Sequence, residues 1–234
     1  YVDTARQLAS DGRDGLGIVT LFAAGNDRSV NLNANYDPTD NMPYAIVVAA
    51  SQADGLITSY STPGASVLVT APGSDPSSMV TTDRQGVLGY NTLPGTAGNY
   101  TNVNGSFFDG TSAATPVAAG VVALMLEANP NLGYRDVQQI LVHSARRAVF
   151  LDADGVQSTI NQAVNWNGGG LMTGDDFGFG NIDAHAAVRL AESWQLRSTA
   201  ANLSLIDGEI QTQTLLVNAG QSGEVTASFA ELNR

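Results

Sequence analysis

Continuous apolar runs predict a buried sheet in the first third of the chain. Residues 17–26 are largely apolar and β-branched and end abruptly, residues 44–50 are apolar throughout, and residues 66–71 stop at a proline-glycine pair. Strands without polar alternation are typical of parallel sheets that are buried on both faces. We therefore expect three core strands at these positions.

Helical patterns surround and follow these runs. A polar helix is expected at 3–10, and three further helices at 116–128, 134–147 and 183–196. The helix at 116–128 starts at a proline and is hydrophobic on nearly all sides, which indicates the centre of a layered domain. Strands that alternate with helices in this way predict an α/β fold.

The pattern changes after the last of these helices. Short β-type runs at 203–206, 210–217 and 224–229 are separated by glycine-containing turns. We therefore expect a main domain over residues 1–197, followed by a short β-rich tail over 198–234.

Composition narrows the choice of partner and compartment. The net charge is −12, all ten basic residues are arginine, and cysteine is absent. An acidic chain without a basic patch lacks the footprint of a nucleic-acid-binding protein, and we find no apolar run long enough to cross a membrane. The negative surface suits a secreted protein and a basic substrate. Disulfides are excluded.

The segment Gly110-Thr111-Ser112 places a serine where the helix at 116–128 is about to begin. Unpaired N–H groups and the helix dipole favour negative charge at such a position. A nucleophile needs this setting, because its attack on a carbonyl generates an oxyanion beside its own amide. Ser112 is therefore a candidate nucleophile, and the alternative is an ordinary helix N-cap.

Asn26 ends the first apolar run. Its side-chain NH₂ would make a second donor for an oxyanion, together with the backbone N–H of Ser112. The alternative is that Gly25-Asn26 is an ordinary turn.

Taken together and in this order, the two segments resemble the subtilisin-like serine proteases, or subtilases. Further stretches at 79–85, 126–132, 134–138 and 177–184 are similar to the kexin/furin branch of that family. The resemblance implies a three-layer subtilisin-like α/β fold with a mostly parallel sheet, of which this chain carries the C-terminal part. It also implies that Ser112 and Asn26 are catalytic and that the following residues bind substrate: Ala23, Ala24, Gly25 and Thr111.

The mechanism implied by the resemblance uses a Ser-His-Asp triad in the chain order Asp, His, Ser. In subtilases the Asp and the His precede the oxyanion Asn, whereas His143 and His185 both follow Ser112. Both histidines lie in helical patterns, which indicates packing or surface positions. We therefore expect the acid and the base on an N-terminal part of the same protease, which would be a partner of this chain.

The resemblance also bears on substrate choice. In the kexin/furin branch an aspartate eleven residues after the oxyanion Asn lines the S1 pocket and pairs with a P1 arginine, and this count leads from Asn26 to Asp37. A carboxylate there would favour a guanidinium through a charge-assisted bond. The alternative is that Asp37 only starts a turn before Pro38.

The family's calcium site near this loop is expected to be absent. Leu32 and Thr62 stand where relatives carry acidic ligands, and an apolar side chain cannot bind a cation that prefers oxygen. Asp152 and Asp154 have the alternation of a calcium loop, with a surface turn favoured instead. No metal ligand is assigned and no cofactor is expected for the chemistry. Structural calcium is expected mainly through the N-terminal part.

These observations predict a secreted serine endopeptidase, and the absence of cysteine favours a bacterial origin. A protein or peptide is the expected substrate, with arginine preferred at P1. The alternatives are a non-catalytic subtilase-like binding module and a subtilase of broad specificity. An esterase is disfavoured because Ser112 lacks a Gly-x-Ser-x-Gly elbow. For the tail, the resemblance implies the first strands of a P-domain, and a β extension or linker is the alternative.

Overall fold

The computed structural model describes most of the first two hundred residues. The chain divides into two units, Tyr1–Asn202 and Leu203–Arg234, and the description below concerns the first. The predicted tail from residue 204 onward lies outside the described residues, as do Asp152 and Asp154. The described ranges are 1–73, 79–101, 108–146, 171 and 173–203.

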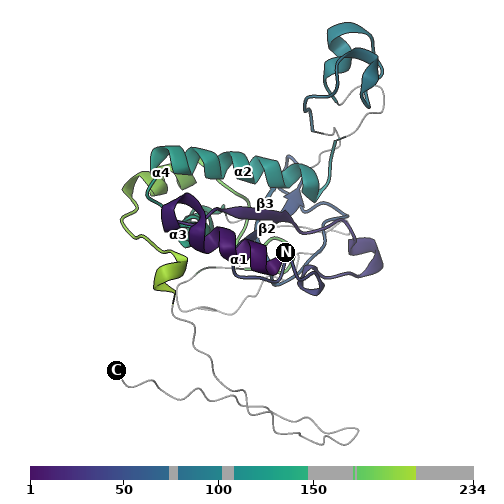
Figure 1. Ribbon diagram of the computed structural model, residues 1–234. Helices are drawn as coiled ribbons and strands as arrows, with labels where there is room; N and C mark the ends of the chain where they lie inside the picture. Colours follow the sequence, from purple (N-terminus) through teal and green to yellow (C-terminus); the bar gives the residue numbers. More distant parts are fainter. Residues whose placement is uncertain (74–78, 102–107, 147–170, 172, 204–234) are drawn as a thin grey trace, which may run out of the picture. The chain divides into compact units, whose positions relative to one another are not determined.

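A three-stranded parallel sheet forms the centre of the first unit (Figure 1). Its strands are β1 (Thr20–Ala23), β2 (Ala45–Ser51) and β3 (Val67–Pro72), in that order across the sheet. Every residue of β2 is buried, as its apolar run predicts. The three expected strands are therefore confirmed, although β1 is shorter than its run, because Gly17 has a φ of 86° in the preceding turn.

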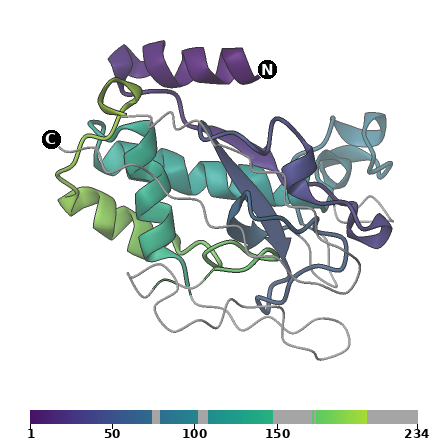
Figure 2. The same ribbon diagram turned by 90° about the horizontal axis from the view of Figure 1, so that it is seen from below.

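Within the described ranges, four α-helices accompany the sheet: α1 (Val2–Asp11), α2 (Thr111–Ala128), α3 (Tyr134–Ser144) and α4 (Ala184–Ser193). α2 contacts all three strands and α4, and α3 packs against α4 and β3. α1 lies apart from the other three helices (Figure 2). The predicted α/β fold is therefore confirmed. Short 3₁₀ helices occupy Gly12–Gly15, Arg28–Val30, Ala34–Tyr36, Gly86–Leu88, Gly95–Asn99 and Ala200–Asn202.

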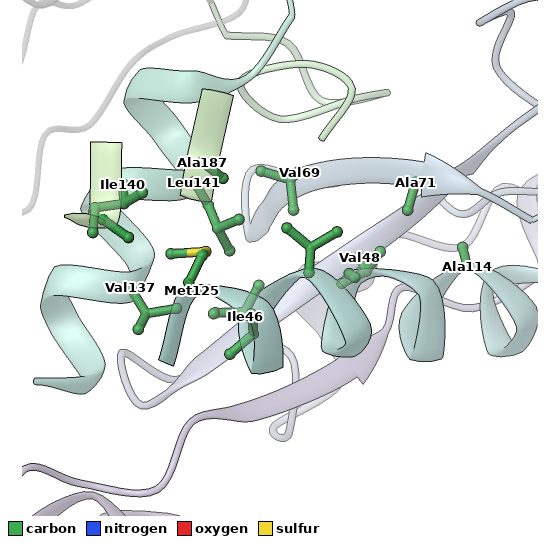
Figure 3. Close-up of a cluster of buried hydrophobic side chains, with 14 of the residues drawn as sticks. Ile46, Val48, Val69, Ala71, Ala114, Met125, Val137, Ile140, Leu141 and Ala187 are labelled. Carbon is green, nitrogen blue, oxygen red and sulfur yellow. The ribbon is translucent and has the colours of Figure 1, made fainter. Parts of the chain in front are cut away.

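The main core lies between the sheet and the helices α2, α3 and α4. Figure 3 shows Ile46, Val48 and Val69 from the strands facing Met125 of α2 and Leu141 of α3. Each of these side chains is almost fully removed from water. Burial of this much apolar surface fixes α2 against the sheet, and α2 carries Ser112 in its first turn.

The predicted start of this helix at Pro116 is wrong. α2 begins at Thr111, so Pro116 is its sixth residue and Ser112 its second. A proline favours the first position of a helix, which explains the prediction. Here the Thr115 hydroxyl donates to the Thr111 carbonyl at 2.8 Å, while Gly110 has a φ of 101° and precedes the helix as N-cap. Ser112 therefore lies inside the first turn and not ahead of it.

Only one face of α2 is covered by the described residues. Ala114, Ala118 and Met125 are fully buried, whereas Leu124 is 49% exposed. A Cβ added at Gly120 would meet no atom within 4 Å. Contrary to the expectation from the sequence, one of the helices described, α2, is long and apolar enough to cross a membrane, a property that core helices of globular domains share. Its apolar outer face is thus not covered by any residue that the structure describes.

Candidate active site

Asn26 and Thr111 are joined by hydrogen bonds across 85 residues of sequence. Asn26 Oδ1 accepts from the Thr111 N–H and from the Thr111 hydroxyl, both at 3.0 Å. The Gly25 N–H in turn donates to Thr111 Oγ1 at 3.2 Å. These bonds hold the loop after β1 against the first turn of α2, so Asn26 and Ser112 lie on adjoining segments.

Gly110 makes this close approach possible. A Cβ at this position would lie 3.1 Å from Asn26 Nδ2, and its φ of 101° is unfavourable for other residues. The Gly110 N–H donates to the Gly73 carbonyl and to the Tyr60 hydroxyl, each at 3.0 Å. The end of β3 and Tyr60 therefore fix where α2 begins.

Two hydrogen-bond donors at this junction have no partner in the part of the chain that the structure describes. The N–H groups of Ala113 and Ala114 both donate to the Gly110 carbonyl, and that of Thr111 donates to Asn26. The Ser112 N–H and Asn26 Nδ2 have no such acceptor, and both residues are exposed. Because Oδ1 of Asn26 is already engaged, its amide presents Nδ2 as a donor. Two free donors of this kind can bind an oxyanion.

Neither histidine contacts this junction by a hydrogen bond among the described residues. His143 lies in the last turn of α3, with its ring centroid 6.5 Å from that of Trp194. His185 lies in the first turn of α4, behind Asp183, whose carboxylate caps that helix by accepting from the Ala186 N–H. Both histidines are exposed on helices.

The predicted substrate-binding residues at the end of β1 and just after it share one cavity of about 320 Å³. Ala23, Ala24 and Gly25 line it together with Asp37. Thr111 is not in its lining and belongs to the neighbouring junction through its bonds to Gly25 and Asn26. The structure therefore brings these predicted residues to one end of the sheet.

Contacts with the segment before β3 and with Asp176 hold the loop that forms the wall of this cavity. The Asn35 Oδ1 accepts from the Ser66 N–H at 2.9 Å, and the Ala34 N–H donates to the Pro63 carbonyl at 2.9 Å. Arg28 forms an ion pair with Asp176 at 2.6 Å. The loop is therefore tied to its surroundings at several points.

Asp37 starts a turn, which is one of the two alternatives that the sequence left open. Its Oδ1 accepts from the Thr39 N–H at 2.8 Å and from the Thr39 hydroxyl at 2.7 Å, so it starts a turn. The same exposed residue lines the cavity. The bonds from Thr39 lower the pKa of the Asp37 carboxyl, so this group is negative at neutral pH.

Asp40 is a cavity residue that the sequence analysis missed. It is only 6% exposed, and its carboxyl accepts no hydrogen bond from the residues described here. Burial, assisted by the negative charge of Asp37, raises its pKa to about 6. In the sequence Asp40 reads as part of a polar turn, and no local signal distinguishes it from a surface aspartate.

We expect Asp40→Asn to stabilise the fold at pH 7 by about 1–3 kcal/mol. A carboxyl whose pKa is raised by folding destabilises the folded state more and more as pH rises from its unfolded pKa to its folded pKa. The gain should therefore be nearly complete above pH 6 and mostly lost at pH 4, where the carboxyl is protonated in the folded state and only about half ionised in the unfolded state. Urea unfolding at both pH values measures this, with Glu127→Gln as a surface control. An equal gain at both pH values would contradict it.

The residues at the predicted lost calcium site do not fit the ion. Leu32 offers no side-chain oxygen, and Thr62 Oγ1 accepts from the Asp27 N–H at 2.9 Å. Throughout the described ranges, no group of three or more His, Asp or Glu side chains is arranged to hold a metal.

Comparisons with known proteins identify the family of this chain. The profile of the subtilase family matches residues 1–180. The chain is 39% identical over 189 residues to a calcium-dependent protease of Trichormus variabilis, covering 77% of this chain and 26% of that protein. It is 34% identical over 191 residues to furin of Mus musculus, covering 79% of this chain and 21% of furin.

An extracellular serine protease of Aeromonas sobria is 31% identical over 188 residues, which are 70% of this chain and 30% of that protein. A solved structure of an Aeromonas sobria serine protease superposes with a TM-score of 0.65 and 26% identity, covering 82% of this chain and 39% of the other. The chain thus spans less than a third of the length of each of these sequence relatives. The match over most of the chain, together with the α/β fold, shows that it belongs to the subtilase family.

Proposed function

We propose that this chain carries the nucleophile and the oxyanion-binding half of a serine endopeptidase. The observation that supports this most strongly is the pair of bonds from Thr111 to Asn26 Oδ1. They fix the amide so that its Nδ2 is available beside the turn that holds Ser112. An amide held before substrate arrives needs little reorganisation in the transition state.

In the proposed reaction, Ser112 Oγ attacks the carbonyl carbon of a peptide bond and its proton passes to a histidine base. The carbonyl oxygen becomes an oxyanion that accepts from the Ser112 N–H and from Asn26 Nδ2. When the C–N bond breaks, the histidine returns the proton to the leaving amine. Water then hydrolyses the acyl-enzyme by the same route.

The acid and the base of this triad are proposed to come from a part of the protease that precedes Tyr1. The open apolar face of α2 around Gly120 and Leu124 supports this, since exposed apolar surface favours a covering partner. Structural calcium is proposed for that part too, because Leu32 and Thr62 do not fit the ion. We further propose secretion, by analogy with the extracellular relative.

Arginine is the proposed P1 residue. Three carboxylates, those of Asp27, Asp37 and Asp40, line the cavity beside the junction, and its described lining contains no cationic side chain. The positive charge of a guanidinium complements these carboxylates, and a guanidinium can bind a carboxylate through two parallel hydrogen bonds.

The test uses the intact protease, meaning this chain with its preceding part, and two peptides that differ only in P1 arginine or leucine. Asp37→Asn should lower kcat/KM for the arginine peptide by about 10–100-fold, because it removes the permanently ionised carboxylate. The leucine peptide should change much less. Glu127→Gln removes one charge from the far end of α2 and should alter neither value.

Losses that are equal for the two peptides would contradict the basic pocket and favour a subtilase of broad specificity. Absence of hydrolysis of either peptide by the intact protein would instead favour a non-catalytic binding module.

A further inference from the structure

The cavity wall contains a buried acid that has no stabilising partner among the residues described. Asp40 ends the turn that Asp37 begins, and its N–H donates to the Asp37 carbonyl at 3.1 Å. The residue is only 6% exposed and lines the cavity. Ionising a largely buried carboxyl without a hydrogen bond or counter-charge is costly, and a cation bound in the cavity would offset that cost.

The groups around Asp40 are negative or neutral. The ionisable side chains that line the same cavity are Asp27, Tyr36 and Asp37. The nearest cation in sequence, Arg28, does not line it and is already paired with Asp176. A cation from outside the described chain would therefore meet two carboxylates on one turn, one exposed and one buried.

We infer that Asp40 is a second specificity-determining carboxyl of the pocket, which binds the P1 guanidinium together with Asp37. This inference rests on the proposed function of the pocket. A guanidinium has five N–H donors in a planar fork, so it can serve both carboxylates at once, whereas an ammonium is a compact point charge. Arginine should therefore be preferred over lysine by way of Asp40.

The two carboxylates should contribute in different pH ranges. Asp37 is ionised throughout the range from pH 5 to pH 8, because the bonds from Thr39 lower its pKa. The pKa of Asp40 lies near 6 when the pocket is empty. Binding of a guanidinium favours the ionised form, so the preference for arginine should strengthen as pH rises through 6.

The experiment measures kcat/KM of the intact protease for matched P1-Arg, P1-Lys and P1-Leu peptides from pH 5 to pH 8. The ratio of the arginine value to the leucine value is the readout, since titration of a shared catalytic base cancels in it. In the wild type this ratio should rise about tenfold between pH 5 and pH 7. In Asp40→Asn it should stay near its low-pH value, and the preference for arginine over lysine should shrink.

Asp37→Asn should lower the ratio at every pH and move its rise below pH 6, because loss of the Asp37 charge lowers the pKa of Asp40. Glu127→Gln should reproduce the wild type. A ratio in Asp40→Asn that still rises through pH 6 would overturn the inference. Equal losses for all three peptides in Asp40→Asn would overturn it too, since they indicate a structural role. A wild type without any preference for arginine would instead refute the basic pocket itself.

Discussion

Ser112→Ala is expected to lower kcat of the intact protease by about 10⁶-fold, with little change in KM. Alanine leaves the first turn of α2 and the donors around it in place but removes the oxygen that forms the acyl-enzyme. The remaining hydrolysis would depend on attack by water, helped only by binding and by the oxyanion donors. Steady-state hydrolysis of a P1-Arg peptide measures the loss.

A fluorophosphonate label assigns the nucleophile independently of the kinetics. Mass spectrometry of the labelled wild type should place the adduct on Ser112, and Ser112→Ala should take up none. Ser10→Ala, which removes an exposed helical hydroxyl that donates to the Gln7 carbonyl, should label and cleave like the wild type. An adduct on another residue would refute the assignment.

Asn26→Ala is expected to lower kcat by about 10²–10³-fold, with a modest change in KM. The side-chain donor should act mainly when negative charge develops on the carbonyl oxygen, so substrate binding is less affected than the chemical step. Because Asn26 also accepts two bonds from Thr111, alanine alone does not separate a donor from a structural anchor.

Asn26→Asp makes that separation. The carboxylate keeps an oxygen for the two bonds from Thr111 but has no N–H to give to the oxyanion. If Asn26 acts as a donor, kcat should fall at least as far in Asn26→Asp as in Asn26→Ala. A near-normal kcat in Asn26→Asp would show that the residue serves only to hold Thr111.

The strands were predictable because a parallel strand that is buried on both faces leaves an uninterrupted apolar run, as at 44–50. The start of α2 could not be predicted, because Pro116 fits the first turn of a helix better than its interior. The bonds that stabilise the five residues before it include those of Thr111 to Asn26, which lies in a distant segment. A local pattern does not contain them.

The pairing of Asn26 with the Ser112 segment was predicted through resemblance to a family, and the bond that holds the pair was not. In the sequence, Thr111 is a neighbour of the serine with no sign of a further contact, and its hydrogen bond to Asn26 exists only in the folded chain. Asp40 was missed for a related reason. Whether an aspartate in a turn is exposed or buried depends on the rest of the fold, and the cavity that Asp40 lines is completed by distant residues such as Thr62 and Ala24.

The contact between Asn26 and Thr111 also affects the order of events during folding. Its partners are 85 residues apart, so it can form only after β1, β2, β3 and α2 have come together. Contacts between residues so distant in sequence form late, because closing the intervening chain costs entropy that only a nearly complete core can offset. A partly folded chain would therefore have the serine without a positioned oxyanion site. Hydrolytic activity would appear only once the domain has folded completely.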